Sequence, residues 1–310
     1  MHLAELVDLY LPHVDKLLSD SEGVSYVAVY VAFNPDILKD LPKPELQDAM
    51  TAMQKAYILS ILERGHLASL TSLARLHDWL TAALEMASAK NPLGFAACLR
   101  GYVEAGADAH DAINLLPGSL IDAGAYLYAV MNRPDLVRCT AVGFDELEKK
   151  LIHYEFAARR PKIGPVLPNH VAAETTAYIR NYERDQGIAG LEALYAHLCD
   201  LTHPARGSVS AFLVKEHSST SFTRFGGSDV INRTLADYSD TLQELVSKSM
   251  NVGVVSIAML SLLTGVWPSA SSQWISSNPS LAKLINCLND KIAIASQPAS
   301  TEDDIRASLR

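Results

Sequence analysis

Apolar residues recur every three or four positions along most of the chain, which is the spacing of one face of an α-helix. The first such segment begins at Leu3 and ends near Leu18. Further helices are predicted at 45–89, 91–116, 120–131, 144–160, 170–184, 188–202, 229–263 and 281–295. Prolines and glycines stand at several of the expected boundaries, as do Pro92 and Pro204. The pattern therefore predicts an all-α fold.

Two short apolar runs around a Ser/Thr-rich turn, Val209–Val214 and Ser221–Phe225, predict one β-hairpin. Another apolar run, Val24–Phe33, fits either a strand or a buried helix. We expect a multi-helix bundle of about nine to eleven helices with a small hairpin insert. Residues 1–44 would form a helix and a linker, 45–296 the main domain with the hairpin near 208–226, and 297–310 a flexible tail.

A long uncharged stretch runs from Ser249 to Ala282. Its most apolar part, Val252–Trp267, has about 16 residues, whereas a membrane-spanning helix needs roughly 20. We interpret it as a buried helix and expect no membrane association. A stretch of this kind also favours burial in a homodimer. The acidic first turns, with Glu5 and Asp8, do not resemble a signal peptide, so a cytoplasmic location is expected.

Composition limits the classes of protein that fit. Hydrophobic residues make up 49% of the chain and charged residues 20%, which excludes global disorder. The net charge of −9 argues against a surface built entirely for nucleic acid, and Arg159, Arg160 and Lys162 form the one basic cluster. The four cysteines are widely spaced and form no CxxC pair, so neither a disulfide framework nor a zinc site is expected.

The helix expected at 91–116 carries a candidate polar pair. Arg100 and Glu104 are four residues apart and therefore lie on one face of the helix. The helix is rich in alanine and glycine, so neighbouring helices could approach it closely. Two interpretations stay open: a surface ion pair worth a few tenths of a kcal/mol, and a buried pair that matters for function.

The helix expected at 188–202 ends beside a candidate histidine. His203 stands before Pro204, on the same flank as Tyr195 and Cys199. A histidine at the negative end of a helix dipole is suited to acid–base chemistry, but it could equally bind the last free carbonyls of the helix. His197 is expected to project from the opposite, solvated side.

Other chemistries have little support in the sequence. Glu63 and His66 have the Glu-x-x-His spacing of carboxylate-bridged di-iron bundles, but there is no second copy of this motif. Motifs for nucleophilic serine catalysis and for phosphate-binding loops are missing. We therefore expect neither a metal nor a cofactor.

The same polar residues carry a family resemblance. Arg100-x-x-x-Glu104, followed in a later helix by Tyr195-x-x-Leu198-x-x-x-x-His203-Pro204, resembles an uncharacterised family of helical bacterial proteins. The similarity covers roughly residues 50–265. That family is distantly similar to the HEPN superfamily of RNase toxins and antiphage proteins.

The HEPN resemblance implies a bacterial stress or phage-defence protein and a metal-independent RNase. In such RNases an Arg-x(4–6)-His motif supplies a phosphate-binding arginine and a catalytic histidine. Here the corresponding positions before His203 hold Ala196, His197 and Leu198. Arg100 could replace the missing arginine only if the two helices touch.

Three functional hypotheses follow from these residues. In the first, Arg100, Glu104, Tyr195 and His203 are catalytic, and RNA is the partner. In the second, the four residues form a structural polar cluster in a non-catalytic binding or regulatory module with a protein partner. In the third, the protein is a small-molecule enzyme with an apolar pocket lined by Tyr102, Tyr195 and Trp267.

Overall fold

The computed structural model describes residues 3–26, 42–138, 140–157, 171–204, 206–216, 219–223 and 227–309. The first half of the chain contains α1 (Leu3–Asp20), α3 (Lys43–Ser88), α4 (Pro92–Ile113), α5 (Leu116–Asp122), α6 (Gly124–Asn132), the 3-10 helix η1 (Pro134–Val137) and α7 (Asp145–Phe156). The second half contains α8 (Thr175–Gln186), α9 (Leu191–Thr202), α10 (Arg206–Ser210), β1 (Leu213–Glu216), β2 (Ser219–Phe222), α11 (Gly227–Asp237), α12 (Ser239–Thr264), α13 (Ser272–Ser277), α14 (Pro279–Ser296) and α15 (Glu302–Ser308). The fold is all-α, as the pattern predicts.

The chain divides into two compact units, and each unit combines three separate segments. Unit 1 comprises 1–16, 71–111 and 172–251, and unit 2 comprises 17–70, 112–171 and 252–310. The main domain expected at 45–296 is therefore divided between them. The boundaries fall inside α1, α3, α4 and α12, so each of these helices begins in one unit and ends in the other.

Unit 1 packs around the buried faces of its helices. Tyr102 of α4 is completely buried, and its hydroxyl lies 2.8 Å from that of Ser249 in α12. Tyr10 of α1 donates a hydrogen bond of 2.9 Å to the side-chain oxygen of Asn251. Hydrogen bonds of this kind satisfy polar groups that burial removes from water.

The turn between α8 and α9 fixes the start of α9. Gly187 ends α8 with φ +62° and Gly190 precedes α9 with φ +84°, values that favour glycine over residues with a Cβ. The carboxylate of Glu183 accepts hydrogen bonds from the backbone N–H groups of Gly190 and Glu192, at 3.3 and 2.7 Å. A carboxylate at this end also complements the positive pole of the helix dipole.

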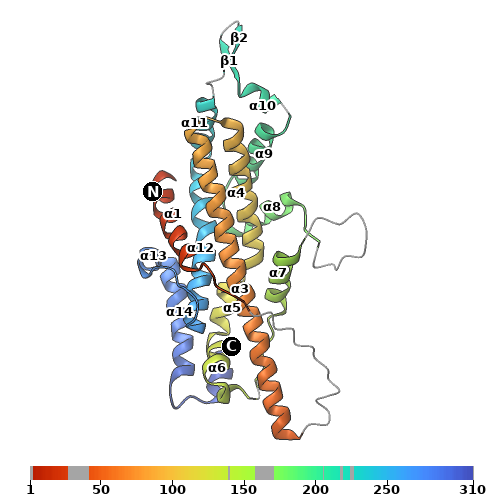
Figure 1. Cartoon of the computed structure of the whole chain (residues 1–310), viewed down its shortest axis with the longest axis vertical. Helices are drawn as coiled ribbons and strands as arrows, with labels where there is room; N and C mark the ends of the chain where they lie inside the picture. The colour runs from red at the N-terminus through yellow and green to blue at the C-terminus, as the bar shows by residue number, and fades with distance from the viewer. Residues whose placement is uncertain are drawn as a thin grey trace. The chain divides into compact units, whose positions relative to one another are not determined.

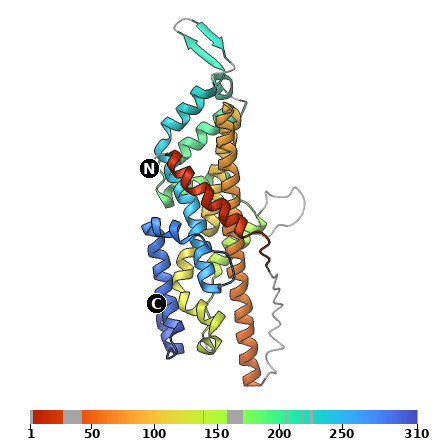
Figure 2. The ribbon, with the colours of Figure 1, turned by 60° about the vertical axis from the view of Figure 1, so that its left-hand side comes forward.

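Strands β1 and β2 pair antiparallel, with Leu213 opposite Phe222 and Glu216 opposite Ser219. They extend beyond α10 in both views of the chain (Figures 1 and 2). The first strand was expected to begin at Val209, but Val209 and Ser210 belong to α10. A helical turn after Pro204 allows the chain to reverse before the strand begins.

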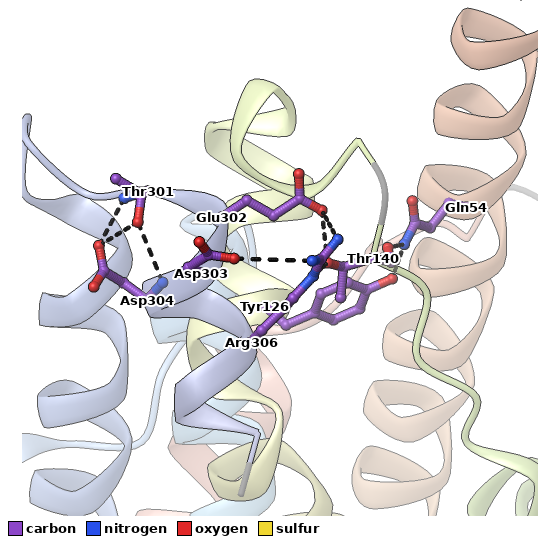
Figure 3. Close-up of polar contacts among 8 residues, drawn as sticks. All are labelled: Gln54, Tyr126, Thr140, Thr301, Glu302, Asp303, Asp304 and Arg306. Carbon is purple, nitrogen blue, oxygen red and sulfur yellow. Dashed lines mark hydrogen bonds and ion pairs between the residues drawn. The ribbon is translucent and has the colours of Figure 1, made fainter.

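Unit 2 contains a polar network that holds the C-terminal helix (Figure 3). The side-chain hydroxyl of Thr140 donates to Glu302 at 2.7 Å and accepts from Nε of Arg306 at 2.8 Å. The amide of Gln54 in α3 donates to the Tyr126 hydroxyl and to the carbonyl of Thr140. These bonds connect α15 to the segment after η1, and that segment to α3 and α6.

The C-terminal residues depart from the flexible tail expected at 297–310. They contain α15, which begins with a capping box formed by Thr301 and Asp304. The side chain of Ile305 is completely buried. A seven-residue helix is too short for its periodicity to stand out in the sequence, and its polar composition concealed it.

Several predicted boundaries are wrong for local reasons. The segment expected as one helix at 229–263 is interrupted at Tyr238, which separates α11 from α12. The helix expected at 91–116 ends earlier, at Ile113, and Pro117 stands in the first turn of α5, where proline is tolerated. Helix α3 runs without a break through Gly65, where the side chain of Leu116 packs within 3.1 Å of the position of a Cβ. Most of Val24–Phe33, the basic cluster at 159–162 and Cys139 lie outside the described residues.

One helix among the described residues, α12, is long and apolar enough to cross a membrane by composition alone. Its most apolar 18-residue window is 67% buried within the protein, as in the core helix of a globular fold. The burial supports the interpretation of this stretch as a core helix.

Candidate functional site

Three of the four candidate site residues meet in unit 1, where α4 contacts α9. The hydroxyl of Tyr195 donates a hydrogen bond of 2.9 Å to Oε1 of Glu104. The same oxygen lies 3.4 Å from Nε of Arg100. We call Arg100, Glu104, Tyr195 and their neighbour Thr202 the α4–α9 cluster.

Thr202 completes the cluster at the last turn of α9. Its hydroxyl oxygen accepts a hydrogen bond of 3.0 Å from Nη1 of Arg100, and its own proton is donated to the carbonyl of Leu198 at 2.9 Å. Thr202 is not among the candidates that the sequence indicates. The signal was present, because Tyr195 and Thr202 are seven residues apart and so lie on one face of the helix.

The cluster is half-buried and remains accessible to solvent. The side chains of Arg100 and Glu104 are 29% and 37% exposed. Burial, together with the hydrogen bond and negative charge of Glu104, raises the pKa of Tyr195 well above its ordinary value. Tyr195 therefore stays protonated at neutral pH and donates to Glu104, while Arg100 retains unused N–H directions toward solvent.

His203 follows Thr202 directly and ends α9. Its backbone N–H bonds to the carbonyl of Cys199 at 2.9 Å, and its backbone is extended, with φ −82° and ψ 157°. The side chain is exposed. Within the described residues its ring makes no hydrogen bond to the other three candidates, so the structure places His203 beside the cluster and not in its hydrogen-bond network.

His197 does not project into solvent as expected. It is half-buried, and its Nε2 lies 3.0 Å from the hydroxyl oxygen of Thr234 in α11. Burial lowers the pKa of His197, an effect partly opposed by Asp200 and Asp237. The periodicity of α9 alone cannot reveal that α11 packs on this side, because helix contacts far apart in the chain leave no local pattern.

The remaining candidates from the sequence have structural environments of their own. Tyr102, proposed to line a small-molecule pocket, is completely buried and bonded to Ser249. His66 of the Glu-x-x-His motif is completely buried in unit 2, and its Nδ1 lies 2.7 Å from the hydroxyl of Tyr26. Across the described part of the chain, no group of three or more His, Cys, Asp or Glu side chains could hold a metal ion.

The cysteines in the described residues, Cys98, Cys199 and Cys287, are free thiols and half-buried. Burial is the main cause that raises the pKa of Cys98, with a contribution from Glu85. A thiol of this kind is a poor nucleophile at neutral pH.

Comparison of the chain with protein-family models, curated proteins and solved structures finds no match. Functional assignment therefore rests on the geometry of the α4–α9 cluster and on the chemistry of its side chains.

Proposed function

We propose that this chain is a HEPN-like protein of bacterial stress or phage defence that cleaves RNA without a metal, at the α4–α9 cluster. One observation carries the proposal. The guanidinium of Arg100 reaches Thr202, the residue immediately before His203. Arg100 of α4 would thereby supply the phosphate-binding arginine that the HEPN motif provides from the helix of the histidine itself.

The cluster supplies the groups that cleavage of an RNA phosphodiester needs. The Arg100 guanidinium would bind the phosphate and stabilise the charge that develops on it. The exposed ring of His203 would accept the proton of the 2′-hydroxyl as that oxygen attacks the phosphorus. The bond to the 5′-oxygen then breaks, and a proton from water converts the leaving oxygen into a free 5′-hydroxyl while the other fragment keeps a 2′,3′-cyclic phosphate. Glu104 and Tyr195 would hold Arg100 in position.

The test is cleavage of a labelled single-stranded RNA by the purified full chain in the presence of EDTA. We expect the wild type to produce 2′,3′-cyclic phosphate ends, and His203→Ala and Arg100→Ala to lower the rate at least about a hundred-fold. His13→Ala, which replaces a histidine of α1, serves as the matched control and should cleave normally. Cleavage that continues unchanged in His203→Ala would refute the proposal.

The second candidate is a non-catalytic binding or regulatory module in which the cluster is structural. The observation that favours it is the closure of the cluster on itself: Glu104 accepts from Tyr195 and pairs with Arg100, and Arg100 donates to Thr202. Such networks fix the packing of two helices without any ligand.

Cleavage separates the two candidates, because the hydrogen bonds of the cluster are the same under both. Tyr195→Phe removes the donor to Glu104 and should lower the free energy of unfolding by about 1 kcal/mol in either case, whereas only the catalytic candidate has a cleavage activity to lose. Tyr128→Phe on α6 is the matched control and should change the free energy of unfolding little. Urea denaturation measures both. His203→Ala discriminates further, because an exposed side chain outside the network should leave stability unchanged while abolishing any cleavage.

A further inference from the structure

A second site lies in unit 1 on the opposite side of α9 from the cluster. It is a hollow of about 480 Å³, within the range of small-molecule pockets. Its walls come from α9, α10, the start of β1 and α11, whose positions in the fold Figure 1 shows. Its lining includes His197, Asp200, Gly207, Asp229, Arg233 and Thr234.

The hydrogen bond between His197 and Thr234 joins the two helices that form the hollow. Beyond this bond, the wall on α9 continues toward the C-terminal end of that helix through Asp200. The wall on α11 continues toward the N-terminal end of its helix through Asp229. The walls of the hollow on α9 and α11 therefore carry both this neutral hydrogen-bonded pair and charged side chains.

Gly207 of α10 keeps the space beside Asp200 open. A Cβ at position 207 would lie 2.2 Å from Oδ2 of Asp200 and 2.8 Å from its backbone oxygen. No larger residue fits there without displacing the carboxylate. The glycine at this position therefore leaves room for the Asp200 carboxylate.

Three charged groups of the hollow have no ion-pair partner among the residues that the structure describes. In the described part of the chain, the side chains of Asp200, Asp229 and Arg233 form no ion pair and no hydrogen bond. All three are exposed to solvent. Burial lowers the pKa of His197, so its ring is neutral at pH 7 and adds hydrogen bonding but no charge.

We propose that this hollow binds a basic amino acid, such as L-lysine or L-arginine, through Asp200, Asp229 and Arg233. Such a molecule carries two cationic groups and one carboxylate, which complement the two carboxylates and one guanidinium of the site. A guanidinium binds a carboxylate in the bidentate geometry that is strong and directional. Asp229 lies in the first turn of α11 and Asp200 in the last turn of α9, so the two carboxylates come from different walls of the hollow.

Calorimetric titration of the full chain with L-lysine and L-arginine tests the proposal. We expect saturable binding of at least one of the two, weakened about ten-fold or more by Arg233→Gln and by Asp229→Asn. Arg180→Gln on α8, outside the lining of the hollow, is the matched control and should bind as the wild type does.

Ligands that lack one charged group test the assignment of each contact. Cadaverine has both amines of lysine but no carboxylate, and it should bind at least about ten-fold more weakly because Arg233 loses its partner. Equal binding of cadaverine and lysine, or equal binding by wild type and Arg233→Gln, would overturn the proposal. So would the absence of binding by both amino acids. The site does not depend on RNA cleavage, so His203→Ala should bind the amino acid normally.

Discussion

The imidazole of His66 is completely buried in unit 2, stacked on Trp267 with ring centroids 4.4 Å apart. Its Nδ1 pairs with the Tyr26 hydroxyl, while Nε2 has no hydrogen-bond partner in the described residues. Burial lowers the pKa of His66 to about 4 from 6.5. A neutral ring is therefore part of the folded state, and a proton on it would be buried without a partner.

Acid should destabilise the protein through His66. The pKa of His66 is lower in the folded protein than in the unfolded chain. Its contribution to the free energy of unfolding is therefore complete above pH 6.5 and is lost as the pH falls toward 4. A difference of this size corresponds to about 3 kcal/mol in the free energy of unfolding. Urea denaturation between pH 7.5 and 4.5 measures it. His66→Gln should flatten this pH dependence, whereas His153→Gln in the same unit should not. An unchanged slope in His66→Gln would contradict the assignment.

Helix α4 owes its close packing to glycine, and one position tests this. The indole of Trp79 in α3 lies on Gly101, where a Cβ would come within 2.6 Å of the ring. Gly101→Ala should therefore displace Trp79 and lower the free energy of unfolding by about 1–3 kcal/mol, despite the better helix propensity of alanine. A change in Trp79 fluorescence should accompany the loss.

Gly118 in α5 is the matched control for Gly101. It has the space for a Cβ, because no atom lies within 4 Å of that position. Gly118→Ala should raise the free energy of unfolding by about 0.5–1 kcal/mol. Equal effects of the two substitutions would show that the contact between Gly101 and Trp79 is unimportant.

Helix α15 should contribute to stability even though its sequence suggests a free tail. Its single completely buried aliphatic side chain is Ile305, and Arg306 bonds to Thr140. Ile305→Ala should lower the free energy of unfolding by about 2–4 kcal/mol. Thr301→Ala, which removes only the capping hydroxyl, should lower it by about 1 kcal/mol. Chemical denaturation measures both, and amide exchange should show that α15 loses protection first in Ile305→Ala.

The elements divide clearly into those that the sequence predicts and those that it does not. Long amphipathic segments such as α1, α3 and α9 are evident because many apolar residues repeat at the helical spacing. The sequence does not reveal the break at Tyr238 or the short helices α10, α13 and α15. Each of these depends on a few residues and on the elements that pack against them. Local pattern cannot supply that information.

The candidate site shows the same limit. Spacing identifies Arg100, Glu104 and Tyr195 as neighbours on their own helices, and the resemblance suggests that they belong together. That Tyr195 bonds to Glu104, and that Thr202 bonds to Arg100, depends on how α9 packs against α4. The charged hollow beside His197 is invisible to periodicity for the same reason.

For the molecule as a whole, a homodimer remains a prediction. The prediction rests on the uncharged stretch from Ser249 to Ala282. Much of this stretch is buried within a single chain, which leaves less apolar surface for contact with a second copy. Leu262 and Val266 are its exposed large hydrophobic residues, 41% and 75% exposed. Two such residues are well short of the apolar surface of a stable dimer. Light scattering during size exclusion at several concentrations tests the prediction, and a mass of 33.7 kDa at all of them would contradict it.

Continuous helices should make the two units unfold together. Helices α1, α3 and α12 each contribute several residues to both units, so melting such a helix in one unit removes its support in the other. Tryptophan provides a probe for each unit, because Trp79 belongs to unit 1 and both Trp267 and Trp274 belong to unit 2. One variant retains Trp79 alone, and a second retains only Trp267 and Trp274. In each variant, the urea midpoint measured by tryptophan fluorescence should equal the midpoint measured by circular dichroism on the same variant. Separate midpoints, with a populated intermediate, would show that the units are independent despite the shared helices.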